Sequence, residues 1–354
     1  MNTALPLTSP PANICILRLS ALGDVTHTLP VVRAIQRYWP QTRITWICGK
    51  LEYRLLAEIE NIRFIVFDKK AGWREYWRIR KLLRDEQFDV LLHMQVALRA
   101  NLLSAMIRAP IRLGWDPERS RDFHQQFINA HIESVQRQHQ VQGFLAFARA
   151  LGLDVVDPEW NLPVTEAARA FAAQYVMPDK KTLLISPCSS HKLRNWHVQG
   201  YAEVADHAVR ELGMQVILSG GPSELEWDTA AAIEREAQSK LINLVGQNTL
   251  QESLGLLQAV DVVLSPDSGP AHIASALGTP VIGLYACTWS QRSGPYRYLD
   301  ECVDHFEQAA EQILHKPAAA LRWGTKIERP GVMDLIEVDE VVARLEQLVS
   351  TDSV

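Results

Sequence analysis

Short apolar runs alternate with amphipathic segments along the chain. Residues 14–19 form a run typical of a buried strand, and residues 25–39 follow with the 3.6-residue period of a helix. The apolar face of that helix is expected to consist of Val25, Leu29, Val32, Ile35 and Trp39. Further strands are predicted at residues 43–48, 63–67 and 89–93, and a helix at residues 51–59. Strands separated by helices indicate a parallel sheet covered on both faces, with ligands at the carboxyl ends of the strands.

The same alternation restarts after residues 154–182, a proline-punctuated connector around one short helix. Strands are predicted at 181–186, 215–219, 241–244, 260–265 and 281–285, and helices at 199–212, 225–236, 250–259 and 271–277. We therefore expect an α/β protein with two doubly wound domains, residues 1–165 and 166–354. A cleft between two such domains is the natural place for a substrate. The last helix is a candidate to pack back on the first domain.

Composition agrees with a globular protein of about two domains. The chain has 354 residues, of which 47% are hydrophobic and 22% charged, which excludes a disordered or fibrous chain. Five widely spaced cysteines without a CxxC pair argue against a disulfide framework or a zinc site. The longest uncharged stretch, residues 268–291, is interrupted by glycine and proline, so no membrane span is expected. The first thirteen residues do not resemble a secretory signal, and a cytoplasmic location is predicted.

Charge is distributed unevenly between the two halves. Residues 1–165 carry 21 Lys and Arg against 16 Asp and Glu, whereas the remainder carries 15 against 25. The excess of cations indicates that the first domain meets an anionic partner, whether nucleic acid, phospholipid headgroups or an acidic substrate. Nucleic acid is disfavoured, because the chain is acidic overall and shows no helix-turn-helix, RNP or zinc-finger pattern.

The turn between the first strand and its helix is the first candidate for chemistry. Gly23 permits a tight approach, and Asp24 stands at the helix start, where its ionised form is favoured. Asp24 is either a helix cap or a general base for a hydroxyl nucleophile. His27, one turn further on, either orients Asp24 or packs in the core.

A second candidate follows the apolar strand at 260–265. Asp267, Ser268 and Gly269 lie where a strand gives way to a helix, so backbone amides and the Ser268 hydroxyl can hold an anion such as a diphosphate. The alternative is an ordinary turn in which Ser268 caps the helix. His272, on the first helical turn, is a phosphate ligand or a packing histidine.

Two further loops follow strands of the second domain. The segment SPCSSHKLRNWH (186–197) offers Ser189, Ser190, Lys192 and Arg194 to one anionic group, unless it is a solvated basic loop. In the segment LSGGPSELEW (218–227), Glu224 is placed to accept hydrogen bonds from ribose hydroxyls or simply to begin a helix.

Residues 69–84 combine cations with aromatic side chains, as a helix does that meets a phosphorylated lipid or a membrane surface. A solvated helix face is the alternative, but the segment has seven cations against a single acid, Glu75, which makes this interpretation less favourable. The chain lacks GxGxxG, GxxxxGK[ST], HExxH and GxSxG, the usual markers of nicotinamide dehydrogenases, P-loop NTPases, zinc proteases and serine hydrolases. No metal-ligand spacing is found among the histidines, and no metal or cofactor is expected.

Four segments in this order resemble glycosyltransferase family 9, which contains the bacterial lipopolysaccharide heptosyltransferases: LRLSALGDVTHTLP, SSHKLRNWH, SGGPSELE and SPDSGPAHIASALGTPVIGLYA. The similarity covers roughly residues 14–300, and the CSSHKLRNW segment is most similar to the heptosyltransferase I type. The resemblance implies a GT-B architecture of two Rossmann-like domains, with the acceptor on the first and the nucleotide sugar on the second. It also implies an inverting, metal-independent transfer of heptose from ADP-heptose to the Kdo of lipid A, at the inner face of the cytoplasmic membrane.

Carried over by motif position, the resemblance implies a role for each candidate residue. Asp24 is the expected catalytic base, the PDSGPAH loop grips the diphosphate, and Glu224 holds the ribose of the donor. Arg194 stands where the family has a lysine, with Lys192 two residues earlier, and either cation could balance the leaving group. The anionic acceptor is expected to contact Gly23, Lys69, Lys70 and Arg74. Two alternatives stay open: a sugar-nucleotide epimerase of similar architecture, and a non-catalytic protein that binds nucleotides or anionic lipids.

Overall fold

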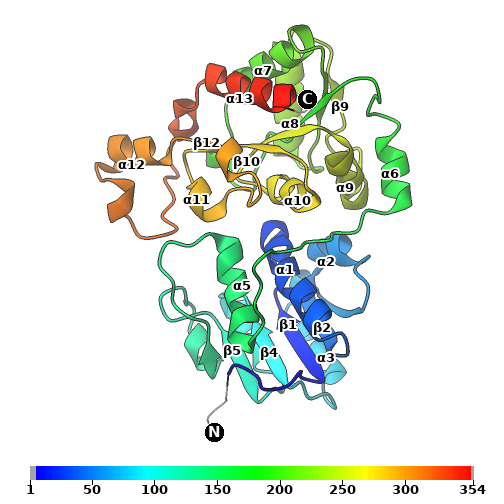
Figure 1. Cartoon of the computed structure of the whole chain (residues 1–354), viewed down its shortest axis with the longest axis vertical. Helices are drawn as coiled ribbons and strands as arrows, with labels where there is room; N and C mark the ends of the chain where they lie inside the picture. Colours follow the sequence, from blue (N-terminus) through cyan, green and yellow to red (C-terminus); the bar gives the residue numbers. More distant parts are fainter. Residues whose placement is uncertain (1–4, 352–354) are drawn as a thin grey trace. The chain divides into compact units, whose positions relative to one another are not determined.

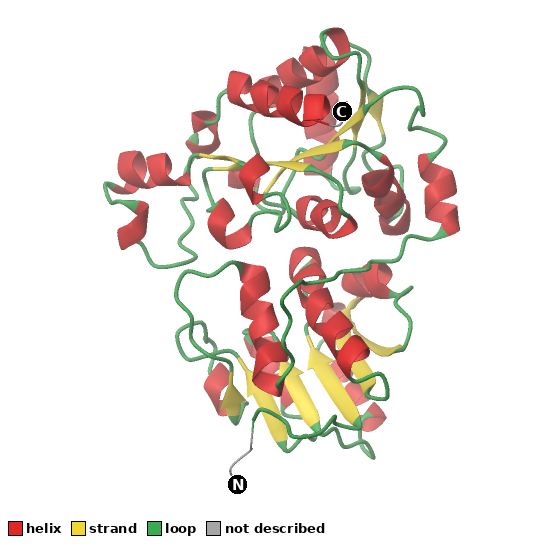
Figure 2. Cartoon of the chain, in the orientation of Figure 1, coloured by secondary structure: helices red, strands yellow, loops and turns green. Residues whose placement is uncertain are grey.

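The computed structural model describes residues 5–351. These residues divide into two compact units, with the boundary between Pro163 and Val164. This division lies two residues before the boundary expected from the sequence. In both units, helices surround a parallel six-stranded sheet (Figures 1 and 2). The predicted α/β class with two doubly wound domains is therefore confirmed.

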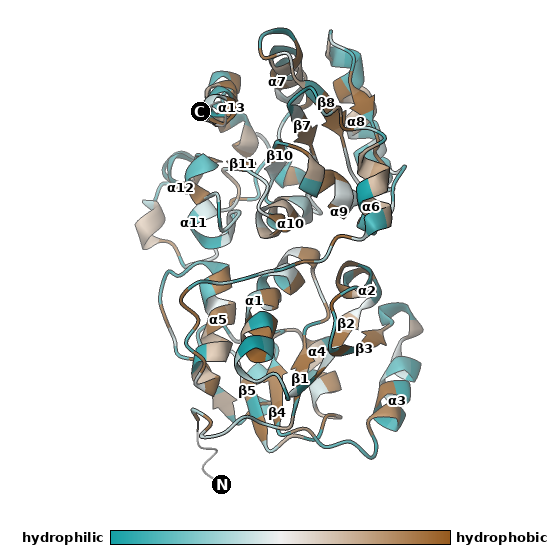
Figure 3. Ribbon diagram, turned by 45° about the vertical axis from the view of Figure 1, so that its right-hand side comes forward, coloured by the Kyte–Doolittle hydropathy of each residue, from teal (hydrophilic) through white to brown (hydrophobic). Residues whose placement is uncertain are grey.

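The sheet of the first unit has the order β3-β2-β1-β4-β5-β6. Its strands are β1 (Asn13–Leu17), β2 (Arg43–Gly49), β3 (Ile62–Phe67), β4 (Val90–His93), β5 (Ile111–Gly114) and β6 (Ala130–His131). Its α-helices are α1 (Leu22–Tyr38), α2 (Lys50–Leu56), α3 (Trp73–Leu82), α4 (Leu98–Ser104) and α5 (Gln140–Leu151). Residues 14–17 of β1 and all of β4 are buried, and Figure 3 shows the largely apolar colouring of these strands against the mixed colouring of α3. The sequence patterns did not predict β5 and β6, which are short.

Helix α1 buries the face that its apolar period predicted. Val25, Leu29, Val32 and Ile35 are all buried, whereas Trp39 follows the last helical residue. The helix begins at Leu22, three residues before the predicted start. Asp24 therefore lies within the first turn rather than before it.

The sheet of the second unit has the order β12-β11-β10-β7-β8-β9. Its strands are β7 (Thr182–Ile185), β8 (Gln215–Leu218), β9 (Ile242–Asn243), β10 (Val262–Pro266), β11 (Val281–Tyr285) and β12 (Val303–Asp304). Its α-helices are α6 (Glu166–Ala172), α7 (Val198–Arg210), α8 (Glu224–Glu236), α9 (Leu250–Ala259), α10 (Gly269–Leu277), α11 (Ser290–Ser293), α12 (Phe306–Leu314) and α13 (Val338–Thr351). The last helix, α13, packs against α7 and β11 of its own unit.

Both sheets have the strand order of a doubly wound fold, in which ligands bind where the order reverses. This reversal lies between β1 and β4 in the first unit and between β7 and β10 in the second. The predicted candidates Asp24, Ser189 and Asp267 all follow strands at these two points. Among residues 5–351, no helix is both long enough and apolar enough to cross a bilayer.

The short helix predicted in the connector is α6, which packs closely on α9. A Cβ atom on Gly255 of α9 would stand 2.1 Å from the carbonyl oxygen of Ala168. Only glycine fits there without moving the backbone, so this contact fixes the start of the second unit.

Candidate active site

Asp24 lies just beyond the carboxyl end of β1, in the first turn of α1. Its Oδ2 accepts a hydrogen bond of 3.2 Å from the Ala21 backbone N–H and forms an ion pair with Arg18. The Asp24 side chain is 31% exposed. Asp24 thus accepts a hydrogen bond at the start of α1, in agreement with the capping interpretation. Its carboxylate is also accessible to solvent.

Arg18 is a residue of this site that the sequence analysis missed. Its side chain is buried, Nη1 donates to the Met94 carbonyl oxygen at 2.6 Å, and the guanidinium lies 5.3 Å from the centre of the Phe144 ring. These contacts hold a buried cation against the Asp24 carboxylate. The available signal was a single arginine within the apolar run ICILRL.

A second carboxylate, Glu52 of α2, lies within electrostatic reach of this pair. Burial raises the pKa of Glu52, the nearby charge of Asp24 adds to the rise, and the cations Lys69 and Arg18 partly oppose it. Lys69, predicted as an acceptor contact, therefore lies within electrostatic reach of Glu52. His27 is buried with its ring centre 6.1 Å from those of His139 and Phe144, which favours the packing interpretation.

The basic segment does not form the single helix that its composition indicated. Lys69–Ala71 is a 3₁₀ turn, and Gly72, with a φ of 57°, separates it from α3. Glu75 is buried and accepts two hydrogen bonds from Arg78 at 2.6 and 2.8 Å, so one of the seven cations is neutralised. Lys69, Lys70 and Arg74 are exposed, whereas Gly23 is half-buried in α1. Trp73 and Trp77 of α3 are also exposed, at 68% and 64%.

In the second unit, Asp267 and Arg194 bring together the loops that follow β10 and β7. Arg194 Nη1 lies 3.8 Å from Asp267 Oδ2, and His272 Nε2 lies 3.4 Å from Asp267 Oδ1. Burial opposes ionisation of Asp267, but the hydrogen bond and charge of His272, together with the charge of Arg194, hold its pKa below the usual range. His272, on the first turn of α10, therefore stabilises the ionised form of Asp267.

Ser268 precedes α10, yet its side chain does not cap the helix, contrary to one interpretation. Ser265 Oγ donates to the Ser186 carbonyl oxygen at 2.9 Å and lies 2.7 Å from Ser268 Oγ, so the Ser268 proton points to Ser265. The backbone amides at the start of α10, beginning with Gly269, remain the donors that a helix N-terminus offers to an anion.

The loop after β7 divides the predicted anion ligands into two groups. Ser189 is buried, and its Oγ donates to the His191 carbonyl oxygen at 3.0 Å, so this hydroxyl shapes the loop. Ser190 and Lys192 are exposed. Arg194 is only 15% exposed and contacts Glu328 as well, with Nη2 3.2 Å from Oε1. Of the two candidate cations, Arg194 is therefore the one placed beside Asp267.

Glu224 is the first residue of α8 and is exposed near the carboxyl end of β8. The turn before it is closed by Glu226, whose carboxylate accepts from the Gly221 N–H at 2.7 Å and from the Ser223 hydroxyl at 2.6 Å. This arrangement leaves Glu224 outside the hydrogen bonds of the turn, as a ribose ligand requires.

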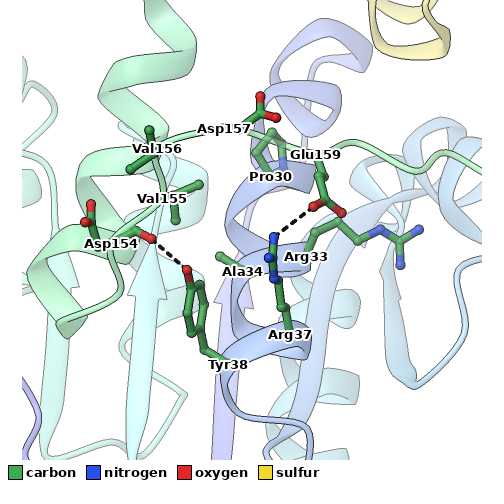
Figure 4. A pocket seen from close by; sticks show the side chains of 10 residues that line it. All are labelled: Pro30, Arg33, Ala34, Arg37, Tyr38, Asp154, Val155, Val156, Asp157 and Glu159. Atoms are coloured by element: carbon green, nitrogen blue, oxygen red, sulfur yellow. Dashed lines mark hydrogen bonds and ion pairs between the residues drawn. The ribbon is translucent and has the colours of Figure 1, made fainter.

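A separate pocket of the first unit lies between the C-terminal half of α1 and the connector (Figure 4). Its cations are already engaged: Arg33 Nε donates to the Trp160 carbonyl oxygen at 3.1 Å, and Arg37 Nη1 lies 2.9 Å from Glu159 Oε1. The Tyr38 hydroxyl donates to the Asp154 carbonyl oxygen at 3.1 Å. None of the predicted site residues lines this pocket, and its contacts anchor the connector on α1.

Comparison with known sequences identifies the family. The model of glycosyltransferase family 9 (heptosyltransferase) matches residues 76–323. The lipopolysaccharide core heptosyltransferase OpsX of Haemophilus influenzae is 42% identical over 345 residues, which cover 97% of this chain and 99% of that protein.

Solved structures agree on the fold. Escherichia coli ADP-heptose lipopolysaccharide heptosyltransferase II has a TM-score of 0.74 at 19% identity, with 97% of this chain and 100% of that chain covered. E. coli heptosyltransferase WaaC with ADP-2-deoxy-2-fluoro heptose has a TM-score of 0.65 at 18% identity, with 86% and 99% covered. The chain accordingly has the GT-B fold of these enzymes, and it belongs to glycosyltransferase family 9, the heptosyltransferase family.

Proposed function

We propose that this enzyme transfers a heptose from ADP-heptose to the Kdo region of lipid A, with inversion at the anomeric carbon. The observation that carries the proposal is the partly exposed Asp24 carboxylate, held by Arg18 at the switch point of the first sheet. The name of OpsX as a lipopolysaccharide core heptosyltransferase supports the reaction class, and the ADP-sugar in the WaaC structure supports the donor. Family membership disfavours the epimerase and the non-catalytic binding protein.

In the proposed reaction, the acceptor hydroxyl oxygen forms a bond to the anomeric carbon as the bond from that carbon to the diphosphate oxygen breaks. The proton of the hydroxyl passes to Asp24, and the electron pair of the broken bond leaves with ADP. Both contacts described for the Asp24 carboxylate fall on Oδ2. Within residues 5–351 this leaves Oδ1 for the acceptor hydroxyl, so we assign the proton transfer to Oδ1.

The donor is proposed to lie on the second unit. The diphosphate contacts Arg194 and the amides that begin α10, while Glu224 binds the ribose hydroxyls. Ser190 and Lys192 are exposed and complete the loop that follows β7. Because the leaving ADP gains negative charge as the bond breaks, preorganised cations and amides stabilise the transition state more than the bound donor.

The acceptor is proposed to bind the first unit through Gly23, Lys69, Lys70 and Arg74. The cations Lys69 and Lys70 lie on the 3₁₀ turn, and Lys69 is electrostatically close to Glu52. Phosphates and carboxylates of Kdo-lipid A match this charge. The exposed Trp73 and Trp77 beside these cations suit a peripheral position on the cytoplasmic face of the inner membrane.

The direct test is to incubate the purified protein with ADP-heptose and a Kdo-lipid A acceptor and to follow the acceptor by mass spectrometry. The expected product is the acceptor with one added heptose, formed equally well in EDTA, and Asp24→Asn is the matched control. An acceptor of unchanged mass would contradict the proposal, and conversion of ADP-heptose without acceptor would indicate an epimerase.

Membrane association is tested separately by co-sedimentation with vesicles. We expect binding to vesicles that contain anionic phospholipid, weaker binding to purely zwitterionic vesicles, and a further loss when Trp73 and Trp77 are both replaced by Ser. Equal recovery with both kinds of vesicle would contradict the peripheral position.

A further inference from the structure

Residues 322–329 of the second unit approach Arg194 from a distant part of the chain. Glu328 Oε1 lies 3.2 Å from Arg194 Nη2, although the two residues are 134 positions apart. The other carboxylate oxygen of Glu328 lies 3.7 Å from His191 Nε2. Glu328 therefore contacts two residues of the loop that follows β7.

This segment is anchored at defined points. Ile327 is 1% exposed, and its backbone N–H donates to the Cys287 carbonyl oxygen at 2.8 Å. The ring of Trp323 lies 5.3 Å from that of Trp289, which stacks on Phe306. With Ile327 buried in the core, the neighbours Lys326 and Glu328 keep solvent access. The anchoring holds Glu328 beside the loop that follows β7.

Arg194 is shared between two carboxylates. Its Nη1 lies 3.8 Å from Asp267 Oδ2, and its Nη2 lies 3.2 Å from Glu328 Oε1. The Arg194 side chain is only 15% exposed, so these two contacts fix the direction of its guanidinium beside the start of α10.

We propose that Glu328 completes the donor site by positioning the Arg194 guanidinium for the leaving diphosphate. This inference rests on the proposed function of the second unit as the donor site. It adds a residue that follows the region matched by the family model, which ends at residue 323. Glu328 is a positioning residue, since its carboxylate acts through Arg194.

The role of Glu328 is tested by a double-mutant cycle on kcat with Arg194. Glu328→Gln is expected to lower kcat about tenfold in the wild-type background and to have little effect in an Arg194→Ala background, with Glu328→Asp partly rescuing turnover. Equal effects of Glu328→Gln in both backgrounds would overturn the positioning role. Failure of the wild-type protein to bind ADP at all would instead overturn the proposed donor site, and this inference with it.

Discussion

The two units share one strand order but place different chemistry at the same point of it. In the first unit, the loop after β1 carries a single carboxylate, Asp24, held by the buried Arg18. In the second, the loops after β7 and β10 bring together Arg194, Asp267 and the N-terminus of α10. The fold thus supplies the position, and the loop residues decide whether a proton or a diphosphate is handled there.

In each half of the chain, the net charge and the charge of the proposed functional group have opposite signs. The first half has an excess of cations, yet its proposed catalytic group is an anion. The second half has an excess of acids, yet the group proposed to meet the diphosphate is the cation Arg194. Overall charge therefore indicates which partner approaches a unit, whereas the chemistry depends on the few groups that the fold places together.

The largest expected effect concerns the base of the first unit. Asp24→Asn keeps the size of the side chain but removes the proton acceptor, so kcat should fall by about 10²- to 10⁴-fold. Steady-state transfer to a Kdo-lipid A acceptor measures this change. Turnover like that of wild type would remove the distinction between a catalytic first unit and a donor-binding second unit.

A second prediction distinguishes the units by their response to acid. His93 Nε2 and His124 Nδ1 of the first unit lie 2.8 and 3.0 Å from Asn101 Oδ1, and His124 Nε2 accepts from the Trp115 N–H at 3.1 Å. Burial lowers the pKa of His124 to about 4 and that of His93 well below its ordinary value. Their neutral forms thus contribute stability that is present above about pH 6.5 and is lost as pH falls towards 4.

Hydrogen exchange followed by mass spectrometry at pH 7 and pH 5 measures this loss. At pH 5, His124 alone should cost the first unit about 2 kcal/mol, roughly a 30-fold fall in protection after correction for intrinsic rates. The lowered pKa of Asp267 in the second unit contributes stability above its unfolded pKa, which is lost only in stronger acid. An equal loss of protection in both units would contradict the assignment to the histidine network, and a His124→Gln variant should show a smaller pH dependence.

The smallest expected effect concerns acceptor binding. Reversing the charge at Lys69, Lys70 and Arg74 should raise the acceptor KM by about tenfold, because the anionic acceptor loses its cationic contacts. The KM for ADP-heptose should not change. If both KM values rise equally, the segment does not belong to the acceptor site alone.

The sequence was sufficient for the parts of the molecule that depend on local pattern. The apolar face of α1, most strands of both sheets and the loops with Asp24 and Asp267 follow from periodicity and from turn residues. The family motifs then indicated which loop residues carry the chemistry.

What the sequence did not predict depends on contacts between distant residues. Arg18 stood in an apolar run, and only the fold shows that Met94 and Phe144 hold it against Asp24. Glu328 meets Arg194 across 134 positions, which no local pattern reveals. The hydroxyl of Ser268 was expected to hold an anion or to cap the helix, but it lies 2.7 Å from the hydroxyl of Ser265.

The division of labour between the units is tested most directly by titrating ADP into wild type, Asp24→Asn and Arg194→Ala in a calorimeter. We predict that Asp24→Asn binds ADP as wild type does, while Arg194→Ala binds it at least about tenfold more weakly. Weakened binding in Asp24→Asn together with unchanged binding in Arg194→Ala would contradict the account.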